Sequence, residues 1–116
     1  MERKTVLVYG SARKGSYNNY IIESGKFLGK TILKGYQLYS LGTYPAVSRK
    51  QNSETVVEVW DVTLNSFMFL DILEKRYDFI PVYEKVKLNG MEIEGIVYIQ
   101  QNLDGYKEIE SGDWFK

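Results

Sequence analysis

The stretch VYEKVKLNGMEIEGIVYI, residues 82–99, gives the clearest secondary-structure signal in the chain. Two runs of alternating apolar and polar residues flank Asn89-Gly90, a dipeptide that tolerates the positive φ angles of a two-residue hairpin turn. Pairing Leu88 with Met91 sets the register of the two strands. In that register the apolar residues share one face: Val82, Val86, Leu88, Met91, Ile93, Val97 and Ile99. The stretch therefore predicts an antiparallel hairpin with one buried face.

Strand-like composition recurs in four further segments, residues 5–9, 26–33, 36–41 and 55–62. We expect the middle two to be separate strands joined by a turn at Lys34-Gly35. The polar segment SRKQNSE, residues 48–54, has no apolar period and predicts a mobile loop. The chain is thus expected to be rich in short strands.

The best helix candidate is TLNSFMFLDILEK, residues 63–75. Its apolar stripe contains Leu64, Phe67, Leu70 and Leu73, widened by Met68. Either Thr63 or Asp61 is suited to cap its start. A second helix of about two turns is expected in YNNYIIES, residues 17–24, ending at Gly25. Strands and helices together predict an α+β fold, mainly antiparallel, in one domain covering residues 1–116.

The composition excludes several kinds of partner and compartment. The 116 residues include 15 basic and 15 acidic side chains, which gives a formal net charge of zero. Because nucleic acids and anionic membranes attract basic surfaces, we expect neither as a partner. No apolar run is long enough to span a bilayer, and no signal peptide is expected at the N-terminus. The chain has no cysteine for disulfides, so we expect a soluble, cytoplasmic protein.

The absence of both histidine and cysteine also restricts the chemistry. A Ser-His-Asp triad, a Cys-His pair and the usual zinc sites all require one of these residues. General acid or base catalysis would therefore depend on a carboxylate, a lysine or one of the ten tyrosines.

The first predicted strand ends in a glycine turn, within VLVYGSARKG at residues 6–15. Backbone N–H groups of a turn such as Gly10-Ser11 can converge on an anion. The Gly-x-x-x-x-Gly spacing lacks the Lys-Ser/Thr of a phosphate-binding P-loop, however. Taken alone, the segment is more often a plain turn than a ligand-binding loop.

A few charged residues have expected structural roles. Glu84 falls on the apolar hairpin face opposite Gly95, which favours a frayed strand end over a polar group satisfied in the interior. Arg13 and Lys14 are expected to be surface charges. Asp113 is expected to cap or pair locally, while the Trp114 ring next to it ties down the C-terminus. None of these side chains is predicted to bind a ligand.

Several segments, in order along the chain, resemble the gamma-glutamylcyclotransferase-like family. They are YGSARKG (9–15), GYQLYSLGTYPAV (35–47), VVEVWDV (56–62), FLDILEKRY (69–77) and IESGDWF (109–115). The correspondence covers nearly the whole chain. Three positions depart from the family pattern, where Ala12 replaces a leucine, Val57 a glycine and Phe79 an arginine.

The resemblance implies a gamma-glutamylcyclotransferase-like fold, a small closed antiparallel β-barrel flanked by short helices with a pocket at one end. It implies that Glu74 is the catalytic residue and that the substrate-binding loop consists of Tyr9, Gly10, Ser11 and Ala12. Family enzymes convert a gamma-glutamyl amine into 5-oxoproline and a free amine without a metal or cofactor. The expected partner is therefore a small-molecule gamma-glutamyl substrate.

A carboxylate that serves as both base and acid needs a pKa near neutrality. Glu74 closes an apolar helix, where desolvation would raise its pKa, and Asp71 one turn earlier could raise it further by like-charge repulsion. Tyr44 and Tyr77 could line the pocket, although core packing is expected for both. Two alternatives stay open: a module that binds a small metabolite without turnover, and an interaction protein that uses a tyrosine-rich face. Oligomeric state is not set by the sequence.

Overall fold

The hairpin predicted at residues 82–99 is present with the expected register. Strands β4 (Ile80–Leu88) and β5 (Met91–Ile99) pair antiparallel, with Leu88 opposite Met91. Asn89 and Gly90 turn the chain with φ angles of 53° and 81°. The structure is a computed structural model that describes residues 2–116.

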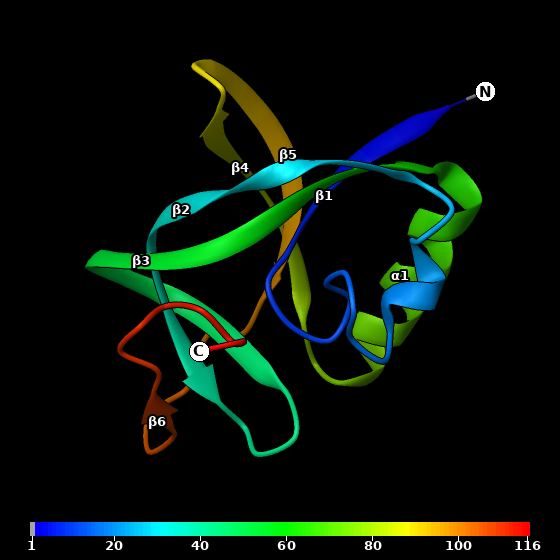
Figure 1. Ribbon diagram of the computed structural model, residues 1–116. Helices are drawn as coiled ribbons and strands as arrows, with labels where there is room; N and C mark the ends of the chain where they lie inside the picture. Colours follow the sequence, from blue (N-terminus) through cyan, green and yellow to red (C-terminus); the bar gives the residue numbers. More distant parts are fainter. Residues whose placement is uncertain (1) are drawn as a thin grey trace.

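The hairpin forms one edge of a six-stranded sheet in the order β4-β5-β1-β3-β2-β6 (Figure 1). The other strands are β1 (Arg3–Val8), β2 (Lys26–Ser40), β3 (Pro45–Thr63) and β6 (Lys107–Glu108). β1 runs parallel to β5, and every other neighbouring pair is antiparallel. The sheet is therefore mixed, and together with the helix it confirms the α+β class.

The sheet is curled but open, so the expected closed barrel is wrong. Thr31 of β2 donates a hydrogen bond to the Lys87 carbonyl of β4, and this side-chain contact bridges the gap between the two strands. Among residues 2–116, no backbone ladder joins β2 to β4. A register shift between Phe27 and Gly29 bends β2 at this point, and a Cβ on Gly29 would lie 2.8 Å from Leu88. The two strands thus meet through side chains rather than through paired backbones.

β2 and β3 are longer and more continuous than predicted. The turn expected at Lys34-Gly35 does not form, because β2 continues through a bulge at Gly35, where φ is 85°. Lys34 pairs with Glu54 and Tyr36 with Arg49, so Gly35 alone stands opposite residues 50–53 of β3. The segment 48–54, predicted to be a mobile loop, is therefore part of β3, with a wide bulge at residues 50–53 between paired residues on both sides.

The long helix is confirmed and the short one is not. Helix α1 (Leu64–Arg76) begins after Thr63, whose hydroxyl accepts a hydrogen bond from the Ser66 amide at 3.2 Å. Residues 17–24 form only the 3₁₀ helix η1 (Asn19–Ile21). The Asn18 amide bonds instead to the Ser11 carbonyl at 2.9 Å, which draws this segment toward the preceding loop. Within residues 2–116, no helix is long and apolar enough to cross a membrane.

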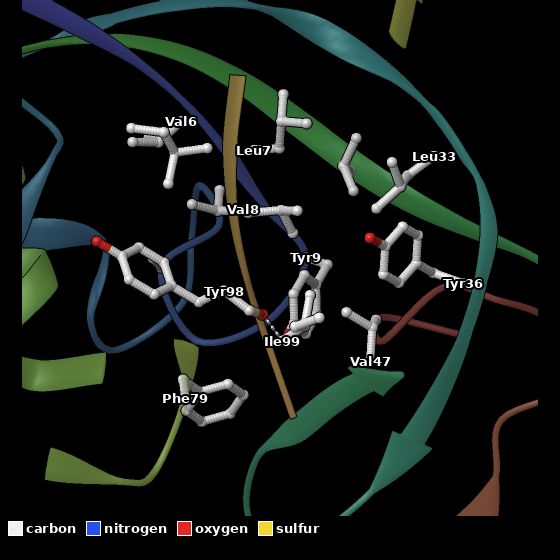
Figure 2. Close-up of a cluster of buried hydrophobic side chains, with 14 of the residues drawn as sticks. Val6, Leu7, Val8, Tyr9, Leu33, Tyr36, Val47, Phe79, Tyr98 and Ile99 are labelled. Atoms are coloured by element: carbon white, nitrogen blue, oxygen red, sulfur yellow. Dashed lines mark hydrogen bonds between the residues drawn. The ribbon is translucent and has the colours of Figure 1, made fainter. Parts of the chain in front are cut away.

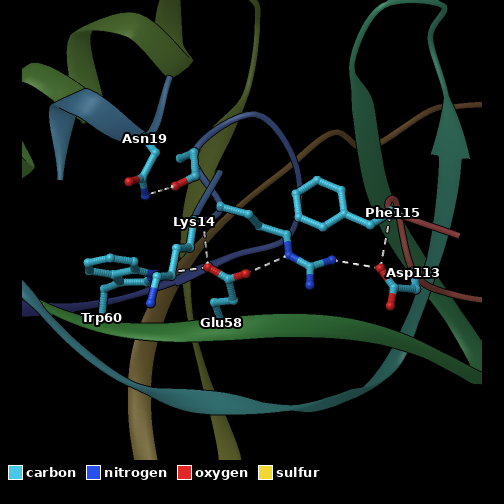
Figure 3. Close-up of polar contacts among 8 residues, drawn as sticks. Lys14, Asn19, Glu58, Trp60, Asp113 and Phe115 are labelled. Carbon is cyan, nitrogen blue, oxygen red and sulfur yellow. Dashed lines mark hydrogen bonds and ion pairs between the residues drawn. The ribbon is translucent and has the colours of Figure 1, made fainter. Parts of the chain in front are cut away.

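Arg13 is buried in an ion-pair network, so its predicted surface position is wrong (Figure 3). Its guanidinium bonds to Glu58 Oε2 at 2.9 Å and to Asp113 Oδ1 at 2.7 Å. Asp113 also accepts the Phe115 amide at 3.0 Å, so the predicted local cap forms alongside a long-range pair. Lys14 is exposed as expected, and its backbone amide donates to Glu58 at 2.8 Å.

The Glu84 carboxylate is partly buried between strands, where it has hydrogen-bond and ion-pair partners, so the frayed-end interpretation is wrong. It lies opposite Gly95 as predicted, in the middle of the β4–β5 ladder. The Tyr36 hydroxyl donates to its carboxylate, and the Arg49 guanidinium lies 3.7 Å away. This cluster of side chains from β2, β3 and β4 supports the curl of the sheet.

Removing the Arg13 guanidinium should destabilise the fold strongly. Arg13→Met leaves two buried carboxylates without a cation, so we expect the free energy of unfolding to fall by about 3–5 kcal/mol. The control is Arg3→Met, which breaks a pair with Asp61 whose side chains are 40% and 33% exposed, and it should cost less than about 1 kcal/mol. Urea denaturation followed by tryptophan fluorescence measures both values. Equal losses in the two variants would contradict the role assigned to the network.

Candidate functional site

The loop after β1 is shaped by close packing at its first residues. Tyr9 and Gly10 are buried, and a Cβ on Gly10 would lie 2.5 Å from the Pro45 ring. Only glycine therefore fits at this position without moving the neighbouring chain. The Arg13 amide donates to the Gly10 carbonyl at 3.0 Å, which closes the turn.

The hydrogen bonds of the loop leave donors rather than acceptors unused. Asn18 donates to Ser11 Oγ at 3.0 Å, and Asn19 donates to the Ala12 carbonyl at 2.8 Å. The Ser11 carbonyl is also occupied, by the Asn18 amide. Within residues 2–116, the backbone amides of Ser11 and Ala12 donate to no partner. Free N–H groups in one turn suit a carboxylate or an oxyanion.

Glu74 lies in the last turn of α1 and is half-buried. Burial raises the pKa of its carboxyl group to about 7. The expected contribution of Asp71 to this shift is not seen. Asp71 binds Lys75 at 2.9 Å and the Tyr98 hydroxyl at 2.7 Å. Desolvation alone therefore accounts for the perturbed acidity of Glu74.

One cavity of about 240 Å³ brings the predicted site residues together. Its lining includes all five of them: Tyr9, Gly10, Ser11, Ala12 and Glu74. The loop after β1 and the end of α1 both contribute to its lining, so Glu74 and the residues that carry the free amides share one cavity. Glu74 is also the only charged side chain among the described lining residues.

Aromatic rings form much of the remaining wall. Tyr44 packs edge-on against Tyr77 with ring centroids 5.6 Å apart, and it lies 6.3 Å from Phe79. Tyr44 and Tyr77 thus line the cavity, whereas the sequence favoured core packing for both. Tyr17 and Tyr98 line it as well and were missed. Both follow ordinary strand or turn patterns, so nothing in their sequence context separates them from the other tyrosines.

Tyr9 directly follows β1 and Tyr98 lies in the neighbouring strand β5 (Figure 2), and both line the cavity with Glu74. The Tyr9 hydroxyl donates to the Tyr98 carbonyl at 2.7 Å. Burial, followed by the charge of Glu74, raises the pKa of Tyr9. Within residues 2–116, no cluster of three or more acidic residues is placed to hold a metal ion. The chemistry of the cavity is therefore that of one carboxyl group among phenols and amides.

Comparison with known proteins gives consistent matches over nearly the whole chain. The family model described as "Gamma-glutamyl cyclotransferase, AIG2-like" matches residues 6–116. The gamma-glutamylcyclotransferase family protein YtfP of Escherichia coli (strain K12) is 33% identical over 110 residues, which cover 94% of each chain.

Solved structures show the same fold. The crystal structure of an uncharacterized protein from Pyrococcus horikoshii matches with a TM-score of 0.81 and 26% identity, covering 96% of this chain and 89% of that one. A mouse AIG2-like protein matches with a TM-score of 0.76 and 17% identity, covering 86% of this chain and 78% of the mouse chain. From the family match and the Escherichia coli relative together, the chain belongs to the AIG2-like gamma-glutamylcyclotransferase family.

Proposed function

We propose that the protein converts a gamma-glutamyl amine into 5-oxoproline and the free amine, with Glu74 as general acid and base. The observation that supports this most is the shared cavity, which is lined by Glu74 and by Ser11 and Ala12, the residues with unpartnered amides. The name of the family, gamma-glutamyl cyclotransferase, agrees with this class of reaction.

The reaction is an internal acyl transfer. The α-amine of the substrate attacks its own γ-carbonyl, a ring C–N bond forms, and the original amide C–N bond breaks. Because nucleophile and carbonyl belong to one molecule, the effective concentration of the nucleophile is already high. The amine arrives as an ammonium, however, which has no lone pair and must first lose a proton.

Glu74 is suited to that proton transfer. With a pKa of about 7, a substantial fraction of its carboxyl group is ionised at neutral pH and can accept the ammonium proton. The resulting acid can then donate the proton to the departing nitrogen. After attack the ring nitrogen carries one further excess proton. The regenerated Glu74 carboxylate accepts it and passes it to the released amine, which leaves as an ammonium. One residue thus serves every proton transfer without another titratable group.

The loop supplies the complementary charge stabilisation. The amides of Ser11 and Ala12 can bind either the substrate's α-carboxylate or the oxyanion that develops on the γ-carbonyl oxygen. Tyr9 is buried, and Gly10 packs closely against the Pro45 ring, so both shape this wall. The Tyr9–Ala12 loop is therefore assigned to substrate binding.

One feature favours a second candidate function, in which the cavity binds a small metabolite without turnover. Phe79 is buried in the cavity wall at the position where the family pattern has an arginine. The cavity therefore lacks a fixed positive charge among its described lining residues. In that case ligand binding would persist while product formation would be absent.

Replacing the proposed base separates the two candidates. Glu74→Gln keeps the size of the side chain but removes its proton chemistry, so we expect kcat to fall by about 10²–10⁴-fold. The matched control is Glu92→Gln, whose side chain is 60% exposed at the hairpin tip and should leave kcat unchanged. Release of 5-oxoproline from a panel of gamma-glutamyl amines measures the effect. Equal rates for wild type and Glu74→Gln would exclude the catalytic role.

The pH dependence of turnover should report the same carboxyl group. Because the ionised form of Glu74 is the base, kcat/KM should rise with pH through a midpoint of about 7. An acid limb centred near 4.5, the ordinary pKa of a glutamate, would contradict the desolvated environment of Glu74. Initial rates between pH 5 and 9, measured at constant ionic strength, give this midpoint.

Folding stability provides a test that needs no substrate. The pKa of Glu74 is about 7 in the folded protein and 4.5 in its ordinary setting, so the folded state holds the proton more tightly. Its contribution to stability is therefore present below pH 4.5 and is lost as pH rises toward 7. The stability of Glu74→Gln relative to wild type should rise by about 1–3 kcal/mol over this window. Urea denaturation at pH 4.5 and pH 8 measures it, and a pH-independent difference would contradict the raised pKa.

A further inference from the structure

Tyr98 connects the cavity to helix α1. It is in β5, next to Ile99, and its ring extends away from Tyr9 (Figure 2). The ring lines the main cavity together with Glu74. Its hydroxyl donates to Asp71 Oδ1 on α1 at 2.7 Å. The phenol therefore links a helix residue outside the cavity wall to the site itself.

The single proton of this phenol is committed to Asp71. Desolvation acts to raise the pKa of Asp71, but the hydrogen bonds from Lys75 and Tyr98 outweigh it and hold that pKa below its usual value. Asp71 is therefore an ionised group that can only accept hydrogen bonds. Lys75 donates to its other oxygen, Oδ2, at 2.9 Å. The geometry leaves Asp71 no proton to give to Tyr98.

The Tyr98 oxygen consequently has only lone pairs left for a further hydrogen bond. A phenol has one donor and two acceptor positions, and within residues 2–116 no group donates to the Tyr98 oxygen. Desolvation, the bond to Asp71 and the charges of Asp71 and Glu74 all raise its pKa, so the phenol stays neutral. An acceptor beside a carboxylate suits a cation that carries several N–H donors.

We propose, on the basis of the function proposed above, that the Tyr98 oxygen accepts a hydrogen bond from the substrate's α-ammonium and holds this nitrogen beside Glu74. Asp71 is then a positioning residue that keeps the Tyr98 proton out of the cavity. After Glu74 removes one proton, the amine still has N–H groups for Tyr98. The same hydrogen bond can thus orient the new lone pair toward the γ-carbonyl.

If Asp71 positions the Tyr98 proton, replacing Asp71 should affect KM more than kcat, an effect that a merely structural role would not produce. In Asp71→Asn, the Lys75 ammonium requires an acceptor and attracts the amide oxygen, so the amide NH₂ turns toward Tyr98. Tyr98 must then accept, and its own proton points into the cavity against the ammonium. We expect KM to rise about tenfold or more, with a smaller change in kcat.

Removing the competing lysine should rescue that variant. In Asp71→Asn/Lys75→Met the amide is free to rotate, so its oxygen can accept the Tyr98 proton again and KM should return most of the way to wild type. Lys75→Met alone should stay close to wild type, because Asp71 still accepts from Tyr98. Absence of rescue, with all variants folded by circular dichroism, would overturn the positioning role of Asp71.

Ligand binding tests the Tyr98 contact without turnover. L-glutamate carries the α-ammonium and glutarate is the same chain without it, so calorimetry with both isolates the ammonium. We expect wild type to bind L-glutamate more tightly than glutarate. Tyr98→Phe should weaken the binding of L-glutamate by about 10–100-fold and leave the affinity for glutarate unchanged. The control is Tyr83→Phe, since Tyr83 is 64% exposed on β4. A wild type without this preference, or an equal loss for both ligands in Tyr98→Phe, would overturn the proposal.

The two proposals fail in different ways. If Glu74→Gln releases 5-oxoproline as fast as wild type, the catalytic role of Glu74 is excluded, whereas the selective loss of L-glutamate in Tyr98→Phe would still support the ammonium contact. If Glu74→Gln is inactive and Tyr98→Phe binds L-glutamate like wild type, the ammonium contact is excluded and the base is retained.

Discussion

The geometry of the candidate site depends on one buried guanidinium. Arg13 joins the loop after β1 to Glu58 of β3 and to Asp113 near the C-terminus, a residue 100 positions away in the sequence. The Arg13 side chain is 4% exposed, and the side chains of Glu58 and Asp113 are 6% and 7% exposed, so water cannot replace either contact. Phe115 packs its ring 4.1 Å from the guanidinium carbon and closes the outer side. The loop that carries Ser11 and Ala12 is thereby held in place by contacts far away in the sequence.

β3 connects this anchor to the proposed base. Glu58 lies opposite Val8, at the point where β1 leads into the loop, and β3 then continues to Thr63. Thr63 caps α1, which carries Glu74 back over the sheet. The strand that holds the loop is therefore the strand that starts the helix. The loop and the helix that contribute to the cavity lining are therefore both attached to β3.

Local features could be predicted from the sequence, and long-range ones could not. The Asn89-Gly90 turn and the Thr63 cap follow from residues adjacent in the chain, and both are confirmed. Burial of Arg13 depends on Glu58 and Asp113, which no local pattern connects to it. The wide bulge opposite Gly35 likewise depends on a partner strand, so the polar segment 48–54 resembled a loop. The five predicted site residues could be named only because several motifs occur in family order.

The last turns of α1 carry two carboxyl groups with different acidities, those of Asp71 and Glu74. Asp71 and Glu74 lie three residues apart, on neighbouring positions of one helix face. Lys75 stands four residues after Asp71 and pairs with it, so Asp71 stays ionised and can hold the Tyr98 proton. Within residues 2–116 no cation pairs with Glu74, and burial raises its pKa to about 7. Because the environments push the two acidities apart, one carboxylate can fix the hydrogen-bond direction while the other exchanges protons.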